Sequence, residues 1–209
     1  MNDALAVHGP RLSLRYPTPA DAPALYEIGS DPEVTRFFSW GPYTDHTQPL
    51  GYIESLGPAR RAGARLEFVI VDEEERLLGI TGLTELSTRD RRAVVGTWLG
   101  RAHWGSGANA ESKALVLALA FRRLGLIRAS ALVNPANVRS VRALERLGFR
   151  HEGVLMAWHL HAEGPQDCAM MRLMREDFEA GPLGAVPASF EGEPPRRWVA
   201  GPASYSQRK

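Results

Sequence analysis

The chain has 209 residues, of which 44% are apolar and 23% are charged, and its formal net charge is +1. This is an ordinary globular mixture, and the near-zero net charge provides no electrostatic case for a nucleic-acid or anionic-membrane partner. The single cysteine, Cys168, excludes an intramolecular disulfide framework and a multi-cysteine metal site, and it is typical of a reducing compartment. The longest apolar run, 114–121, is far shorter than the roughly 20 residues of a membrane span, and residues 1–10 do not form a signal peptide, so we expect a cytoplasmic protein.

The first third of the chain predicts one strand followed by helices. Alternating apolar and polar residues predict a strand over 12–16. The sequence Thr18-Pro19-Ala20-Asp21 is typical of a helix start. Threonine is a common N-cap, proline suits the first helical position, and a carboxylate three residues after the N-cap can accept the backbone amide of the N-cap residue. A short irregular or helical piece over 31–40 and a second helix over 44–61 follow.

From residue 66 onward the pattern changes to strands. An antiparallel meander is predicted over 66–71, 77–86 and 93–99, separated by turn sequences. A largely apolar helix over 106–124, a buried strand over 126–133 and a helix over 137–147 come next. A final pair of strands is predicted over 149–161 and 166–174.

We expect the chain to divide into three parts, of which the tail is distinguished by its composition. Residues 1–10 are an N-terminal extension, residues 11–178 form one domain, and residues 179–209 form a tail rich in glycine and proline. We expect this tail to be extended or disordered. The aromatic residues that can still dock it on a surface are Phe190, Trp198 and Tyr205.

The segment 103–109, His-Trp-Gly-Ser-Gly-Ala-Asn, joins a predicted strand to the long helix. Its glycines allow backbone N–H groups to converge on a ligand, and the helix N-terminus favours an anion such as a pyrophosphate. A P-loop is excluded, because Gly107 is followed by Ala-Asn and not by Lys-Ser or Lys-Thr. A dinucleotide fold is disfavoured, because the preceding strands form a meander and no acidic residue ends the next strand.

The segment 134–149, Asn-Pro-Ala-Asn-Val-Arg-Ser-Val-Arg-Ala-Leu-Glu-Arg-Leu-Gly-Phe, predicts a well-capped helix. Asn137 is a good N-cap, and Gly148 can end the helix in a left-handed turn. By themselves these features indicate local structure only.

Together, these segments resemble the GCN5-related N-acetyltransferases, most closely the branch that acetylates ribosomal-protein N-termini and similar amines. Four motifs occur in the family's order over residues 11–178: Thr-Pro-Ala-Asp from Thr18, Trp-Gly-Ser-Gly-Ala from Trp104, Asn-Pro-x-Asn-x-x-Ser from Asn134, and Leu-Gly-Phe-x-x-Glu-Gly from Leu147. The resemblance implies a mixed α/β fold of the α+β class: a seven-stranded, mostly antiparallel sheet, about four helices and a central strand pair that splays apart.

The resemblance also implies that acetyl-CoA binds in the gap between the splayed strands, with pantetheine along Trp98 and Leu99 and pyrophosphate on the glycine loop. The implied cofactor-binding residues are Trp98, Leu99, His103, Trp104, Gly105, Ser106, Gly107, Ala108, Asn109, Asn137 and Ser140.

Two catalytic positions of many relatives differ here. A tyrosine acid is replaced by Leu144, and a glutamate near the cofactor strand is replaced by Val94. The resemblance implies that Ser140 hydrogen-bonds the sulfur of the leaving group. In the branch that the chain resembles, a glutamate can lie on the strand after Leu-Gly-Phe, and His159 matches that place. The resemblance therefore makes His159 the first candidate for the base, since a histidine with an ordinary pKa near 6.5 can accept a proton directly or through a water, and Glu85 is the second.

The acceptor pocket is expected to involve Phe38, Trp40 and Asp167. We expect no metal, because the histidines 151, 159 and 161 lack a fourth ligand.

The predicted activity is transfer of an acetyl group from acetyl-CoA to a primary amine, either a peptide or protein N-terminus or a small amine. The alternative is a catalytically weak module that binds acetyl-CoA or CoA as a sensor or interaction protein. The resemblance favours a homodimer.

Overall fold

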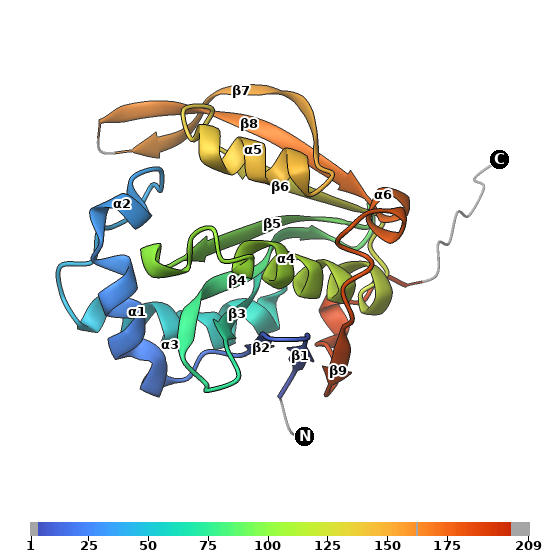
Figure 1. Ribbon diagram of the computed structural model, residues 1–209, viewed down its shortest axis with the longest axis horizontal. Coiled ribbons are helices and arrows are strands. Elements are labelled where there is room, and N and C mark those ends of the chain that lie inside the picture. Colours follow the sequence, from blue (N-terminus) through green and yellow to red (C-terminus); the bar gives the residue numbers. More distant parts are fainter. Residues whose placement is uncertain (1–3, 162, 202–209) are drawn as a thin grey trace.

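The computed structural model describes residues 4–161 and 163–201, and Tyr205 lies outside them. One twisted sheet runs through the molecule with helices on both faces (Figure 1). The strand order is β7-β8-β6-β5-β4-β3-β2-β1-β9. The strands are β1 (Ala6–His8), β2 (Ser13–Arg15), β3 (Arg65–Val71), β4 (Leu77–Ser87), β5 (Arg92–Leu99), β6 (Arg128–Val133), β7 (Arg150–His161), β8 (Gly164–Met174) and β9 (Ser189–Glu191).

Six α-helices connect these strands in the described part of the chain. They are α1 (Ala22–Gly29), α2 (Pro32–Thr35), α3 (Thr47–Ala62), α4 (Ala108–Ala118), α5 (Val138–Arg146) and α6 (Arg175–Ala180). The predicted start of the first helix is confirmed, since the Thr18 amide donates to the Asp21 carboxylate at 2.7 Å just before α1. The long helix predicted to reach residue 124 ends earlier as α4 and continues as a π-helical turn, Leu119–Arg123.

The predicted meander is confirmed, because β3 pairs with β4 and β4 with β5, both antiparallel. Successive side chains of a strand point to opposite faces, so this sheet has two apolar surfaces. On one face Val69, Val71 and Ile80 pack against α1 and α3. On the other face Leu66 and Phe68 belong to the larger core that includes α4.

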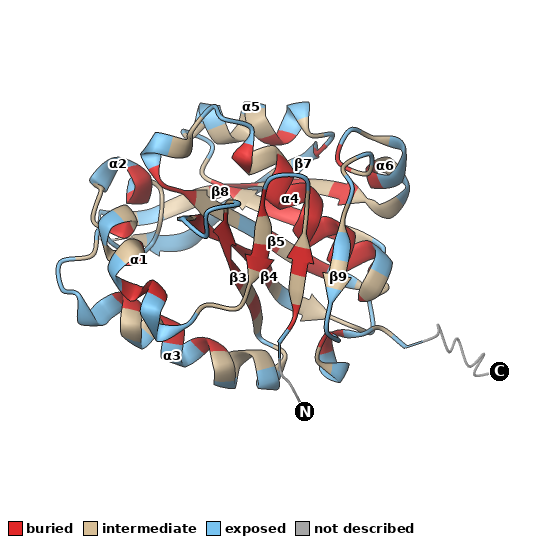
Figure 2. Cartoon of the chain, turned by 60° about the horizontal axis from the view of Figure 1, so that its bottom comes forward, coloured by how far each residue is buried: buried red, intermediate tan, exposed pale blue. Residues whose placement is uncertain are grey.

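Helix α4 is the centre of that larger core. All eight residues from Glu111 to Ala118 are buried (Figure 2). The apolar sequence predicts this from Ala114 onward, whereas the polar residues 111–113 are buried in addition. The carboxylate of Glu111 accepts the backbone amides of Arg11 and Leu12 at 2.8 and 2.9 Å. This buried acid therefore ties α4 to the turn between β1 and β2.

The splay of the central strands is present. β5 and β6 run parallel and pair only from Arg92 with Arg128 to Val94 with Ser130. β5 continues to Leu99, while β6 continues to Val133 and pairs there with β8. The two strands separate as they approach the N-termini of α4 and α5, which leaves a gap in the middle of the sheet.

The expected strand number is wrong, and the described part of the tail is docked through Trp198, one of the aromatic residues predicted to allow this, and is not disordered. The sheet has nine strands and not seven, because β1 lies in the N-terminal extension and pairs antiparallel with both β2 and β9 of the tail. Six α-helices replace the expected four, since the short α2 and α6 are added. Elements of three to six residues carry too few repeats of a period to be recognised in a sequence.

The described part of the tail packs on the domain. Trp198 is fully buried, and its Nε1 donates to the carbonyl of Arg60 at 3.0 Å. The Ala200 amide donates to the carbonyl of Leu124 at 2.8 Å. Among the described residues, no helix is long and apolar enough to cross a membrane.

Candidate active site

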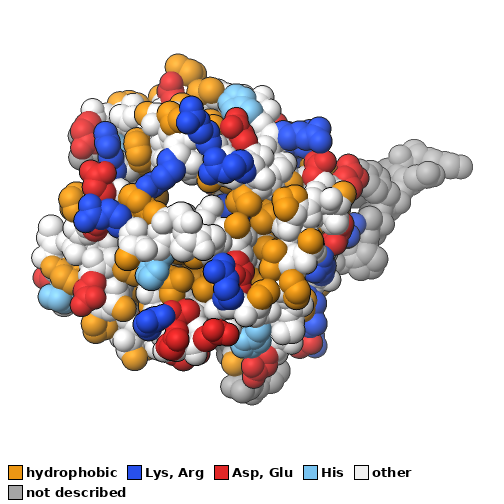
Figure 3. All heavy atoms as spheres, in the orientation of Figure 1, with side chains coloured by type: hydrophobic (Ala, Val, Ile, Leu, Met, Phe, Trp, Pro, Cys, Tyr) orange, Lys and Arg blue, Asp and Glu red, His pale blue; other side chains and the backbone are white. Residues whose placement is uncertain are grey.

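A cavity of about 420 Å³ lies between the end of β5, the loop before α4 and helix α5. Its size is within the range of small-molecule sites. Figure 3 shows this side of the molecule hollowed, with basic side chains around the opening. The lining residues are Glu33, Val34, Phe37, Phe38, Thr97, Trp98, Leu99, His103, Trp104, Gly105, Gly107, Asn109, Ala110, Asn137, Arg139, Ser140, Ala143, Arg146 and Leu147. The structure thus brings together all the predicted cofactor residues except Ser106 and Ala108.

The glycine loop is held in a shape that only glycine adopts easily. Gly105 and Gly107 have φ of +77° and +89°, and no heavy atom lies within 4 Å of a Cβ placed on Gly105. Side chains are thus absent where a ligand can approach the backbone. The Ser106 hydroxyl donates to the carbonyl of His103 at 2.8 Å and accepts the Ala108 amide at 3.3 Å. Ser106 and Ala108 therefore shape the loop without lining the cavity.

Helix α5 forms the opposite wall. The Asn137 side chain accepts the Ser140 amide at 3.2 Å, which confirms Asn137 as the N-cap. This bond places the Ser140 hydroxyl at the cavity, one helical turn from the cap. Leu144, which replaces the tyrosine of many relatives, is buried in the main core.

One contact crosses the cavity from wall to wall. The guanidinium of Arg139 on α5 lies 3.4 Å from the centre of the Trp104 ring. The indole Nε1 of Trp104 in turn donates to the carbonyl of Leu99 at 3.0 Å. These residues therefore connect the two sides of the splay at the cavity.

Sequence reasoning missed the basic residues of this wall. Arg139, Ala143 and Arg146 are spaced by four and three residues, so they share one face of α5. Leu144, on the opposite side of the same helix, is buried in the core. Arg139 and Arg146 place two positive charges beside the glycine loop.

A second cavity, of about 150 Å³, shares Phe37 and Phe38 with the first. Its lining residues are Phe37, Phe38, Ser39, Trp40, Leu132, Asn134, His159, His161, Asp167 and Cys168. The structure thus brings His159 to the three predicted acceptor residues Phe38, Trp40 and Asp167. Aromatic contacts extend this wall, because Trp40 packs on both Tyr43 and Trp98 with ring centres 5.2 and 5.4 Å apart.

Asp167 has a structural contact inside this cavity. Its Oδ1 accepts the backbone amide of Ala157 at 2.9 Å, and Ala157 has a φ of +51°. The register between β7 and β8 shifts at this point, between Leu155 and His159. Asp167 therefore holds the bulge that precedes His159 along β7.

The structure does not support a catalytic role for Glu85 or Cys168. Glu85 is exposed at the irregular end of β4 and lines neither of the two cavities. Cys168 lines the smaller cavity, but burial raises the pKa of its thiol, which disfavours a thiolate nucleophile. No group of three or more metal-ligating side chains occurs in the residues that the structure describes.

A buried lysine supports the glycine loop from inside. Lys113 on α4 is 6% exposed, and its Nζ donates to the side-chain oxygen of Asn109 at 2.8 Å. Burial lowers the pKa of Lys113 to about 7. Asn109 is itself a lining residue, so this bond orients a side chain of the cavity.

Known proteins share this arrangement. Residues 11–150 match the acetyltransferase (GNAT) domain family. The chain belongs to this family. An uncharacterised N-acetyltransferase p20 of Bacillus licheniformis is 32% identical over 80% of this chain and 95% of its own length.

Solved structures agree with this assignment. A putative acetyltransferase from T. thermophilus has a TM-score of 0.73 and 29% identity, covering 83% of this chain and 90% of its own. RimJ of Mycobacterium smegmatis, solved in complex with CoA-disulfide, has a TM-score of 0.76 over 86% of this chain and 91% of its own. At 23% identity the RimJ structure supports the fold alone.

These findings confirm the predicted fold family and the enzyme class. The chain is a GNAT acyltransferase, an N-acetyltransferase that uses acetyl-CoA. The cavity at the splay has the glycine loop, helix N-terminus and positive charges that suit the anionic part of this substrate.

Proposed function

We propose that this acetyltransferase moves the acetyl group of acetyl-CoA directly to a primary amine, either a peptide or protein N-terminus or a small amine. The amine nitrogen attacks the thioester carbonyl, the new C–N bond forms, and the C–S bond breaks as the amine loses a proton and the thiolate gains one. The observation that carries this proposal is the pair of cavities that share Phe37 and Phe38. Two substrates can therefore enter separately and meet at the splay.

In this proposal the larger cavity takes acetyl-CoA. Pantetheine pairs with the backbone near Trp98 and Leu99, and pyrophosphate binds the N–H groups of residues 105–109. The positive end of α4 and the neighbouring arginines stabilise the phosphates. The smaller cavity takes the acceptor, with Trp40 and Asp167 in its wall.

Ser140 is the proposed donor to the sulfur. Its side chain lines the larger cavity at the N-terminus of α5, whose positive end favours a developing thiolate. Ser140→Ala is expected to lower kcat by about 10- to 100-fold, because a hydrogen bond to a charged group is lost in the transition state. Steady-state thiol release measures kcat, and isothermal titration with CoA separates this effect from binding, since the affinity for CoA is expected to fall less than kcat. A variant with wild-type kcat would remove Ser140 from the mechanism.

His159 is the proposed proton acceptor, because it lines the smaller cavity while Glu85 lines neither. Neutral imidazole can take the amine proton directly or through one water molecule. Asp167 supports this role through the bulge that it holds before His159.

Arg139 is expected to bind a phosphate of acetyl-CoA. Arg139→Ala is expected to weaken CoA affinity by about 10- to 100-fold, because a charge-assisted hydrogen bond and the stacking on Trp104 are both lost. Titration calorimetry with CoA tests this. The matched control is Arg142→Ala, which removes an exposed charge of the same helix that does not line the cavity. Equal affinities for the two variants would contradict the assignment.

The alternative function is a CoA-binding module with little catalysis, and Leu144 and Val94 favour it because they replace an acid and a base of many relatives. One plate assay separates the two functions. It measures thiol release from acetyl-CoA against amines including n-butylamine, spermidine and an N-terminal tripeptide, together with thermal stabilisation by CoA. Thiol release with one amine class supports the transferase. Stabilisation with no release supports the module.

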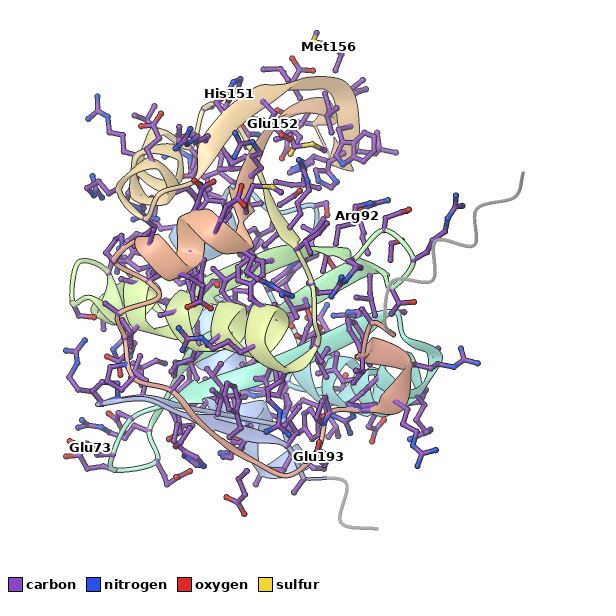
Figure 4. All side chains as sticks on the ribbon, turned by 90° about the vertical axis from the view of Figure 1, so that its right-hand side faces the viewer. Glu73, Arg92, His151, Glu152, Met156 and Glu193 are labelled. Carbon is purple, nitrogen blue, oxygen red and sulfur yellow. The ribbon has the colours of Figure 1, made fainter. Side chains whose placement is uncertain are left out.

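We also propose a cytoplasmic homodimer. β7 is an edge strand of the sheet, and it exposes four large apolar side chains: Val154, Met156, Trp158 and Leu160. Figure 4 shows Met156 pointing away from the body of the molecule. An exposed apolar edge strand is a template for pairing with another chain, which supports a second copy as the partner.

A further inference from the structure

A glutamate lies on the face of the sheet that packs against α1 and α3, without a role in the mechanism above. Glu67 on β3 pairs with Gly82 on β4, and Gly82 pairs with Gly96 on β5. The side chain of Glu67 shares a face with Val69, which packs against α1 and α3. The carboxylate therefore lies beside two strand positions that have no side chains.

The two glycines leave a path from Glu67 to the cofactor strand. A Cβ on Gly82 would lie 2.5 Å from Cγ of Glu67, so the glutamate side chain already leans over β4. A Cβ on Gly96 would meet no heavy atom within 4 Å, and Gly96 is exposed although β5 is a central strand. The surface above Gly96 is therefore open.

This open position borders the cofactor cavity. Adjacent strands lie about 4.8 Å apart, so the backbones of Glu67 and Gly96 are about 10 Å apart, and the glutamate side chain spans part of that distance. Glu67 and Gly96 line neither of the two cavities, but the three residues that follow Gly96, Thr97 to Leu99, all line the larger one. A group above Gly96 therefore lies between the carboxylate and the place proposed for the thioester.

The carboxylate is held by one oxygen only. Tyr52 donates its hydroxyl to Oε2 of Glu67 at 3.1 Å, and Arg65 lies 2.7 Å from the same oxygen. Burial raises the pKa of Tyr52, and the Glu67 charge raises it further, so the phenol stays a donor. Among the described residues no hydrogen bond reaches Oε1, while the Glu67 side chain keeps 16% of its surface exposed. Oε1 is thus available to a further donor.

Aromatic rings surround the same opening. Trp98 follows Gly96 by two residues on the same face, and its ring meets Trp40 edge-on, with Tyr43 on the other side of Trp40. Rings combined with a carboxylate form an environment that suits an organic cation. The opening therefore suits an amine in its protonated, ammonium form.

We propose that Glu67 binds the ammonium group of the acceptor amine and holds it above Gly96, next to the thioester. This inference rests on the proposed function and extends it, because it assigns Glu67 as the residue that binds the charged form of the acceptor amine. Glu67 is a binding residue here, and His159 keeps the proton transfer.

The test is Glu67→Gln, which keeps an oxygen for the Tyr52 hydroxyl and removes the charge. With the amine of the panel that the wild type acetylates best, KM for that amine is expected to rise about 10- to 100-fold, which corresponds to the loss of a hydrogen bond between charged groups. KM for acetyl-CoA and the melting temperature are expected to change little. Tyr52→Phe is expected to raise the same KM by less. Glu54→Gln, an exposed position of α3, is the matched control.

A direct binding measurement separates this inference from the proposed function. n-Butylamine, spermidine and the tripeptide are titrated by calorimetry into the CoA-bound wild type and the CoA-bound Glu67→Gln variant. The inference is supported if the wild type binds the amine and the variant does not. This holds even if the wild type releases no thiol, because the absence of thiol release overturns only the transferase. Equal amine KM or equal amine affinity in the two proteins overturns the inference and leaves the transferase standing.

Discussion

Replacing Lys113 by methionine is expected to raise the free energy of unfolding at pH 7 and to flatten its dependence on pH. Burial lowers the pKa of Lys113 from 10.5 to about 7, so above pH 7 the native protein has lost a proton that the unfolded chain still carries. Unfolding then takes up a proton, and the free energy of unfolding rises with pH by about 1.4 kcal/mol per unit until about pH 10. Below pH 7 Lys113 is protonated in both the native and the unfolded protein, so the free energy of unfolding is lowered by the full cost of burying its charge.

The free-energy cost of burying the Lys113 charge exceeds the stabilisation that the lysine provides through its hydrogen bond. Over three pH units the cost reaches about 4 kcal/mol, whereas the hydrogen bond from Nζ to Asn109 stabilises the fold by about 1 kcal/mol. The first turns of α4 also carry positive partial charge, which disfavours a cation there.

Urea unfolding at several pH values between 6 and 10 measures the difference between wild type and Lys113→Met. The difference is expected to be largest at pH 6 to 7 and to shrink toward pH 10. Arg142→Met, an exposed charge on α5, is the control and is expected to leave the wild-type pH profile unchanged. Parallel profiles for wild type and Lys113→Met would show that Lys113 is not buried as a neutral amine.

Trp198→Ala is expected to lower the free energy of unfolding by about 3 to 5 kcal/mol, the usual cost of removing a large buried aromatic side chain. Trp198 is fully buried although it lies in the glycine- and proline-rich tail. Its Nε1 bond to Arg60 and the Ala200 bond to Leu124 attach the tail to the ends of α3 and of the turn after α4. Affinity for CoA is expected to stay unchanged, because the tail does not line the larger cavity.

Denaturant unfolding measures this cost, and Val199→Ala provides the control, because Val199 is the neighbouring apolar residue of the same tail and is 41% exposed. The control is expected to cost less than about 1 kcal/mol. Trp198→Phe keeps most of the ring and removes the N–H, so it is expected to fall between the two. A cost for Trp198→Ala as small as that of the control would show that the tail is not docked in solution.

The two walls of the larger cavity could be predicted from the sequence as local features, because they are built from short contiguous segments. The glycine loop at 103–109 and the capped helix from Asn137 each carry a local signal, and the structure places both on one cavity. The meander from β3 to β5 and the buried helix α4 follow from hydrophobic periods of two and from a long apolar run. Local sequence thus determined most elements and the family.

Contacts between distant segments were decided only by the tertiary structure. The row from Glu67 through Gly82 to Gly96 depends on strand register, which a one-residue slip would destroy, and no local period reports it. The contact of Arg139 with Trp104 and the burial of Trp198 likewise join residues that are 35 or more positions apart. Most of the elements, the fold family and the glycine loop follow from the sequence alone, because short-range propensity, caps and periodicity specify them. The strands β1 and β9, the docked tail and the residues of the smaller cavity follow only from the folded chain, because register and packing bring distant residues together.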